Sequence, residues 1–202
     1  MAVDREAGGL GDIVDIGSGG VFDYDVSALS RITAVDLFAD MIDAKRYPDH
    51  VTFVQGSALD VPLPSASVDG VVIVILLHHL VGTDVAQSHA NMQKCIEEAA
   101  RILRPGGKLV LVESCVPHWF YAFEKVVYKT AARFIEALLS HPVTLQYPIE
   151  VVEEAMHRVF TKVRTEHIPK GKFVLQFGIK VPSALTPVDP YIIVGEKALD
   201  AT

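Results

Sequence analysis

Two hydrophobic periods alternate along the chain, and together they predict alternating strands and helices. Short apolar runs rich in β-branched residues are typical of strands, whereas apolar residues three and four positions apart are typical of helices. Strands are predicted at Asp12–Ile16, Arg31–Asp36, Val51–Gln55, Gly70–Leu76 and Lys108–Glu113. The last two are nearly continuous runs of Val, Ile and Leu, as expected of strands buried on both faces. This alternation predicts an α/β fold with a parallel sheet covered by helices.

The second half of the chain is predicted to add helices and two closing strands. Helices are predicted at Asp84–Leu103, which Thr83 or Asp84 can cap, at Pro117–Ser140 and at Ile149–Phe160. Strands are predicted near Lys162–Ile168 and at Tyr191–Glu196, and the three prolines within Gly178–Pro190 favour a hairpin connection. We therefore expect a single domain over 1–202 with a helical insertion at 114–150.

Composition narrows the classes of function. Half of the residues are hydrophobic and the mean hydropathy is +0.32, yet the longest apolar run, Val71–Leu77, is too short to span a bilayer. A signal peptide is not expected, because no basic region followed by an apolar region opens the sequence. Cys95 and Cys115 lack metal-ligand spacing, which fits a reducing cytoplasm. The 18 basic residues are scattered among 25 acidic ones, which argues against a nucleic-acid partner and for a small-molecule substrate.

A glycine turn directly follows the first predicted strand. The segment Ile13–Gly20 reads Ile-Val-Asp-Ile-Gly-Ser-Gly-Gly, and the second strand ends in Asp36, 21 residues after Asp15. Glycines let a ligand approach the backbone, and a carboxylate at the end of the next strand can bind two ribose hydroxyls. The structural alternative is that Asp36 caps a helix over Phe38–Tyr47, and the two roles are compatible. The pattern predicts a nucleotide-binding crevice.

Two residues favour S-adenosylmethionine (SAM) over a nicotinamide cofactor. Phe22 stands where the third glycine of the dinucleotide pattern G-x-G-x-x-G would be, and it would obstruct the close approach of helix and strand. Asp15 suits a positively charged ligand end better than a pyrophosphate, and SAM carries an α-ammonium. A nicotinamide oxidoreductase is therefore the weaker alternative.

Three further segments resemble class I SAM-dependent methyltransferases. Val54–Leu63 is similar to their G-D-A-x-D-L-P-F stretch, Val68–Leu80 to their fourth strand with its L-H-H ending, and Glu97–Glu113 to their R-x-L-x-P-G-G-x-L segment. With the glycine turn, the order and spacing match from about Leu10 to Glu113, roughly half of the chain. The resemblance implies a Rossmann-like, doubly wound, seven-stranded sheet, mostly parallel with the last strand antiparallel, and a helical lid after strand five.

The resemblance also implies a set of cofactor contacts at the carboxyl ends of the predicted parallel strands, where ligands bind in open α/β sheets. The implied residues are, for the methionine end, Asp15, Gly17, Gly19 and Gly20; for the ribose, Asp36; for the adenine, Leu37, Met41, Ser57, Ala58 and Leu59; and for the floor of the methionine tail, Ile75 and Leu76.

The sequence departs from this family at several positions. Val21 occupies the third glycine position of the D-x-G-x-G-x-G pattern, and Ser57 stands where an Asp usually accepts from the adenine amino group. Phe22–Ser30 leaves little room for a full first helix, and about ten residues precede the first strand. These departures keep open a non-catalytic SAM-fold protein that acts through a dimer or another partner.

His78 and His79 are the candidate catalytic residues, because they follow the fourth strand and histidine titrates near neutrality. The alternative is that one packs in the core and the other caps the next helix. The aromatic residues of 118–123 either line an apolar acceptor site or pack a helix against the core. No metal site is expected. We expect an enzyme that moves the methyl group of SAM to an O, N or S atom of a small, partly apolar acceptor, and a homodimer is a further hypothesis.

Overall fold

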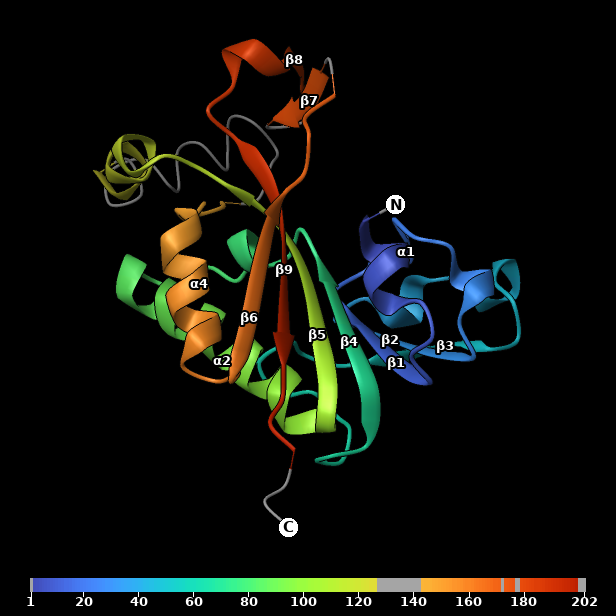
Figure 1. The fold of residues 1–202 in the computed structure, drawn as a ribbon. Coiled ribbons are helices and arrows are strands. Elements are labelled where there is room, and N and C mark those ends of the chain that lie inside the picture. The colour runs from blue at the N-terminus through green and yellow to red at the C-terminus, as the bar shows by residue number, and fades with distance from the viewer. Residues whose placement is uncertain (1, 127–142, 172, 177–178, 200–202) are drawn as a thin grey trace.

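Seven strands form the central sheet of the computed structural model, which describes residues 2–126, 143–171, 173–176 and 179–199 (Figure 1). Their order across the sheet is β3-β2-β1-β4-β5-β9-β6. These strands are β1 (Asp12–Ile16), β2 (Arg31–Asp36), β3 (Val51–Gln55), β4 (Val68–Val74), β5 (Leu103–Cys115), β6 (Lys162–His167) and β9 (Asp189–Glu196).

The sheet is parallel from β3 to β5 and antiparallel at β9. Val14 of β1 pairs with Thr33 of β2 and with Val71 of β4, all in parallel register. β9 runs antiparallel to both β5 and β6 and lies between them, with Val110 opposite Val194. The predicted seven-stranded, mostly parallel sheet with an antiparallel last strand is confirmed.

The strand bounds match the predictions where each apolar run is isolated by turn residues. β1, β2 and β3 begin and end as predicted. β4 ends two residues earlier than predicted, because Ile75 adopts a φ of +53°, which takes the chain out of the strand. β5 begins five residues earlier than predicted, since the Pro105-Gly106-Gly107 segment stays in the strand next to a register shift between Val68 and Gly70.

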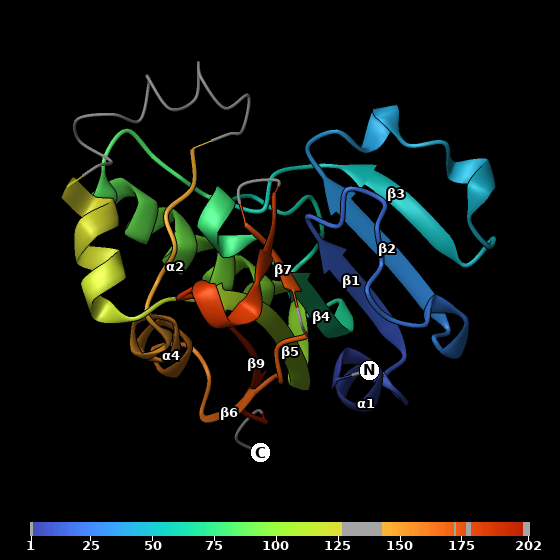
Figure 2. The same cartoon turned by 90° about the horizontal axis from the view of Figure 1, so that it is seen from above.

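Helices cover the two faces of the sheet unequally. α2 (Val85–Ile102) and α4 (Ile149–His157) lie on one face, and the short α1 (Ala2–Ala7) lies on the other (Figure 2). The Asp84 side chain caps α2 by accepting from the backbone N–H of Gln87 at 2.8 Å. Among the described residues, no helix is long and apolar enough to cross a membrane.

The connections 17–30 and 37–50, described throughout, contain 3₁₀ turns and no α-helix. These turns are η1 (Val26–Ala28), η2 (Ala39–Met41) and η3 (Ala44–Arg46). The first connection has no full helix, as predicted from its length. The helix over 38–47, which was the structural alternative for Asp36, is absent, and that alternative is wrong in this respect. Asp43 is the local cause, because its side chain accepts from the backbone N–H of Lys45 and stabilises a turn instead.

Aromatic packing replaces helices over this part of the sheet. Phe22 lies 5.7 Å from Tyr24 and 5.8 Å from Tyr47 between ring centroids, and Tyr47 lies 4.8 Å from Phe53 of β3. These edge-to-face contacts bury apolar surface without a regular helix. The residue that argued against a dinucleotide turn, Phe22, is therefore part of a packing cluster.

The segment after β5 is described in part. Residues 118–126 are helical, which agrees with the start of the helix predicted over 117–140. The rest of that helix, and most of the predicted lid over 114–150, falls on residues 127–142, outside the described residues. β7 (Phe173–Gln176) and β8 (Ile179–Pro182) form a separate two-stranded antiparallel ribbon, followed by η5 (Ser183–Leu185). A hairpin is thus present, but it begins before the predicted segment 178–190.

Candidate cofactor site and histidine turn

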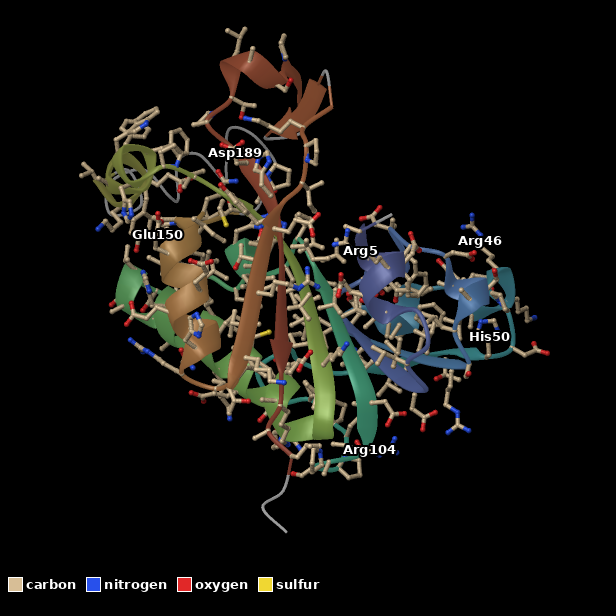
Figure 3. All side chains as sticks on the ribbon, viewed as in Figure 1. Arg5, Arg46, His50, Arg104, Glu150 and Asp189 are labelled. Atoms are coloured by element: carbon tan, nitrogen blue, oxygen red, sulfur yellow. The ribbon has the colours of Figure 1, made fainter. Side chains whose placement is uncertain are left out.

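The predicted site residues gather at one end of the sheet. Asp189, at the start of β9, pairs with Cys115 at the end of β5, whereas Arg104 near the start of β5 lies at the opposite end (Figure 3). There Arg104 forms an ion pair with Asp69 at 2.5 Å. The carboxyl ends of the parallel strands therefore share the Asp189 end of the sheet, which is where open α/β sheets bind ligands.

Asp15 of β1 is a buried carboxylate with one oxygen left unsatisfied. Its residue exposure is 2%. Oδ2 accepts from the hydroxyl of Tyr24 at 2.6 Å, and Oδ1 has no hydrogen-bond partner among the described residues. Burial raises the pKa of Asp15 to about 7, helped by the charges of Asp23 and Asp36 and opposed by the Tyr24 hydrogen bond. A buried carboxylate oxygen without a donor is costly unless a cation or a donor arrives from a ligand.

The glycine turn has the conformation that only glycine adopts readily. Gly17, Gly19 and Gly20 have φ angles of +79°, +57° and +79°. A Cβ on Gly17 would lie 2.6 Å from the side chain of Leu76, so this glycine also lets the ends of β1 and β4 approach each other. Val21 donates its N–H to the Ser18 carbonyl at 2.9 Å and is 70% exposed. The turn therefore closes without a glycine at position 21.

Asp36 joins the glycine turn to the end of β2. Its Oδ2 accepts from the N–H of Gly19, and its Oδ1 accepts from the N–H of Phe38, both at 2.9 Å. The capping alternative is thus met in part, since Asp36 caps the chain after β2 but no α-helix follows. Each carboxylate oxygen has a second lone pair, so both can still accept from ribose hydroxyls.

The residues assigned to adenine line the same end of the sheet. Leu37 and Met41 are 58% and 79% exposed, so their apolar side chains are accessible to a ligand at this end of the sheet. The Ser57 hydroxyl oxygen accepts from the N–H of Leu59 at 3.1 Å, and its proton remains available for donation. Ala58 and Leu59 are partly buried against the core beneath α2.

The turn after β4 places His78 against a buried glutamate that sequence reasoning did not single out. In η4 (Leu77–His79), the N–H of Leu77 donates to Oε2 of Glu113 at 2.7 Å, and Nδ1 of His78 lies 2.8 Å from its Oε1. Glu113 is fully buried. The signal in the sequence is an acidic residue at the end of the apolar strand predicted at Lys108–Glu113.

His78 and His79 have different surroundings. His78 is buried, whereas His79 is exposed, and their ring centroids are 4.1 Å apart. Burial by itself would lower the pKa of His78, but the Glu113 carboxylate outweighs it, so the pKa is raised above the ordinary value. The two candidates are therefore not equivalent, because His78 is buried against the carboxylate of Glu113.

The helical residues 118–126 add a second carboxylate and divide the aromatic cluster. Glu124 accepts from the N–H of Gln146 at 3.1 Å, and burial raises its pKa to about 7, while the nearby His78 opposes this rise. Tyr121 is buried and hydrogen-bonds Nε2 of His89, whereas Trp119 and Phe123 are exposed. Part of the cluster is therefore core, as the packing alternative predicts. Among the described residues, no group of His, Cys, Asp or Glu is arranged to hold a metal ion.

Comparisons with known proteins agree with this geometry. Residues 14–111 match the family model described as a methyltransferase domain. Over 112 residues the chain is 34% identical to the ubiquinone/menaquinone biosynthesis C-methyltransferase UbiE of Rubrivivax gelatinosus, which covers 54% of this chain and 41% of that protein. This chain thus contains a region, residues 14–111, that matches a class I SAM-dependent methyltransferase domain. It spans less than half the length of that curated relative.

Solved structures confirm the class I methyltransferase fold. The YcgJ protein of Bacillus subtilis matches with a TM-score of 0.63 and 16% identity, over 98% of this chain and 97% of that one. The N-methyltransferase NodS of Bradyrhizobium japonicum, in complex with S-adenosylhomocysteine (SAH), matches with a TM-score of 0.59 and 16% identity, over 96% of this chain and 82% of that one. At these identities the likeness concerns the fold.

The residues at this site fit SAM, the cofactor of class I methyltransferases. SAM carries an α-ammonium, a ribose diol and an adenine, which require a carboxylate, a second acceptor and an apolar wall. Asp15 has an unsatisfied buried oxygen, Asp36 retains free lone pairs, and Leu37 and Met41 are exposed beside them. The orphaned oxygen of Asp15 is the observation that decides the fit, because the fold alone does not account for it.

Proposed function

We propose that this chain binds SAM at the carboxyl ends of β1, β2 and β4 and directs its methyl group to a small, partly apolar acceptor. The observation that carries the proposal is the unsatisfied Oδ1 of the buried Asp15, next to a left-handed glycine turn in a matched methyltransferase domain. An ammonium group would supply the missing donor and offset the burial of the charge.

The remaining assignments follow from placement. Asp36 would accept from the ribose hydroxyls, the exposed Leu37 and Met41 would cover the adenine, and Leu76 would support the methionine tail against Gly17. Gly19, Gly20, Ser57, Ala58, Leu59 and Ile75 complete the proposed cofactor set. When bound, SAM supplies an electrophilic methyl group on a sulfonium, so the protein's main task is to orient the acceptor in a dry site.

The side chains around His78 favour a class of acceptor, a small molecule with an apolar ring system. Tyr121 and Tyr147 lie 6.2 Å apart between ring centroids, and the N–H of Leu145, two residues before Tyr147, donates to the carbonyl of His78. An apolar ring system therefore suits this region better than a charged polymer. Transfer to O, N or S stays a prediction, and the name of the Rubrivivax relative adds carbon as an acceptor atom. His78 is the proposed base for an acceptor that must lose a proton.

A second candidate function remains because the protein itself already binds two backbone N–H groups of the glycine turn. The N–H of Gly19 is bound by Asp36, and that of Gly20 by Ser18. Phe38 and Met41 are 64% and 79% exposed, which suits a surface that contacts another protein. A non-catalytic protein that acts through a homodimer or another partner is therefore the alternative. Homodimerisation, a cytoplasmic location, the domain bounds and the lack of a nucleic-acid partner stay predictions.

Calorimetric titration of SAH separates the two functions. We expect micromolar binding by the parent, a loss of at least about tenfold in Asp36→Ala because two hydroxyl acceptors disappear, and unchanged binding in the control Asp40→Ala, an exposed carboxylate on η2. No heat from a folded parent sample that is free of bound ligand would contradict the proposal and favour the non-catalytic alternative.

A further inference from the structure

Glu113 is a charged side chain in the interior of β5, and its burial demands an explanation. It is fully buried between valine- and leucine-rich positions of the strand. Removing a carboxylate from water costs several kcal/mol unless hydrogen bonds and opposite charge offset the loss. Three donors meet this one side chain: the N–H groups of Leu77 and Ser114, at 2.7 and 2.8 Å, and Nδ1 of His78 at 2.8 Å.

These bonds hold the histidine turn from β5. A carboxylate only accepts hydrogen bonds, so Nδ1 of His78 is the donor and carries the proton. In the neutral ring the lone pair is then on Nε2, which becomes the nitrogen that can take up another proton. The backbone of His78 is fixed from the other side as well, because its carbonyl accepts from the N–H of Leu145 at 3.0 Å.

We infer that Glu113 is a positioning residue for methyl transfer, which fixes His78 in the tautomer whose Nε2 accepts the proton of the acceptor. This inference rests on the proposed function. As the acceptor's bond to hydrogen breaks, its proton bonds to Nε2 of His78. The electron pair left on the acceptor forms the new bond to the methyl carbon, whose former bonding pair stays on the departing sulfur.

Glu124 gives the same histidine a second acidic neighbour. It extends from the helical residues 118–126, accepts from the N–H of Gln146 at 3.1 Å, and interacts electrostatically with His78. A protonated His78 is thus stabilised by Glu113 through a direct hydrogen bond and by Glu124 through its charge. Such a pairing of histidine with an orienting carboxylate is the arrangement that makes a histidine an effective base.

Nitrogen NMR of the histidine rings tests the inference without turnover. The parent, Glu113→Gln and the exposed control Glu97→Gln are titrated in the absence of cofactor. We expect Nδ1 of His78 to carry the proton in the parent, and the pKa of His78 to fall by about one unit or more in Glu113→Gln, because the carboxylate charge is lost. Glu97→Gln should match the parent. A proton on Nε2 in the parent, or an unchanged titration in Glu113→Gln, would overturn the inference.

Kinetics with labelled SAM and reduced 1,4-naphthoquinone as the probe acceptor add the functional readout. His78 must be neutral to accept a proton, so the rate should rise with pH through its pKa, and this limb should move to lower pH in Glu113→Gln while kcat falls about 100-fold. If kcat falls in Glu113→Gln but the rate still rises at the same pH as in the parent, Glu113 has only a structural role.

Two controls keep this test apart from that of the proposed function. SAH titration of Glu113→Gln should give the affinity of the parent, because Glu113 is not among the proposed cofactor contacts. If that variant does not fold, His78→Gln is the second variant, and it should abolish the rise of the rate with pH. A parent that binds no SAH would refute the proposed function, whereas the NMR titration would still decide whether Glu113 holds His78.

Discussion

At the scale of single residues, the site contains two buried carboxylates that differ in how fully their oxygens are hydrogen-bonded. Glu113 has a donor for each oxygen, whereas Asp15 has a donor only for Oδ2. The first is stabilised in the protein alone, and the second is stabilised only when a ligand brings a cation. The stability of the ligand-free protein should therefore depend on the ionisation of Asp15.

Asp15→Asn should stabilise the ligand-free protein at alkaline pH while weakening SAH binding. The pKa of Asp15 rises from 3.8 to about 7 on folding, so between these values the folded state binds more protons than the unfolded state. The stability of the parent should then fall as pH rises from about 4 to 7, by an amount on the order of 4 kcal/mol at most, and the variant should lack this slope.

Urea unfolding of both proteins at pH 5 and pH 8 measures this difference, with Asp40→Asn as the exposed control. The idea fails if the parent and Asp15→Asn lose equal stability between the two pH values.

At the scale of elements, α2 holds the segment that follows β3. Arg101 donates to the carbonyls of Val61 and Leu63, both at 2.8 Å, and pairs with Glu98 at 2.8 Å. Oε2 of Glu98 in turn accepts from the N–H of Val61 at 3.0 Å. The R-x-L-x-P-G-G motif, which begins at Arg101, and the segment Val61–Leu63 are far apart in the sequence but are held together by these bonds.

Arg101→Ala should destabilise the fold by about 1.5–3 kcal/mol, because several hydrogen bonds to a charged group are lost and Glu98 keeps its burial without its main partner. Arg158→Ala is the matched control, since Arg158 forms an exposed i, i+4 pair with Glu154 and should change stability by less than about 0.5 kcal/mol. Equal losses of unfolding free energy in urea would show that the Arg101 contacts contribute no more than a surface pair.

The sequence was informative where local pattern decides the structure. β1, β2 and β3 were predicted to the residue because each apolar run is bounded by polar or turn residues. The helix considered over 38–47 was wrong because one side-chain-to-backbone bond, from Lys45 to Asp43, competes with it. The contact between His78 and Glu113 joins residues 35 positions apart, and no local pattern specifies which carboxylate a histidine will meet.

At the scale of the whole molecule, the two ends of the sheet have different roles. The carboxyl end carries the glycine turn, Asp36 and the histidine turn, and the opposite end carries the Arg104–Asp69 pair. Arg5 of α1, which is labelled in Figure 3, pairs with Glu166 of β6 at 2.5 Å. This ion pair links the helix on one face of the sheet to the edge strand β6.

Hydrogen exchange with and without SAH should therefore respond at one end only. We expect slower exchange for amides of residues 15–20, 36–38 and 75–79 on addition of SAH, and no change at residues 103 and 104, because binding stabilises the contacts around the ligand. Uniform protection of the sheet, or none, would contradict a site at the carboxyl end.

The position of β9 has a consequence for biosynthesis. β9 follows every other described strand in the chain, yet it occupies an interior place between β5 and β6. β6 has no other partner in the seven-stranded sheet, so it must wait, unpaired, while the ribosome adds the residues up to Glu196. The edge of β5 therefore stays without its neighbour until β9 has been synthesised, and β9 then pairs with β5 and β6 in one late, non-local folding step.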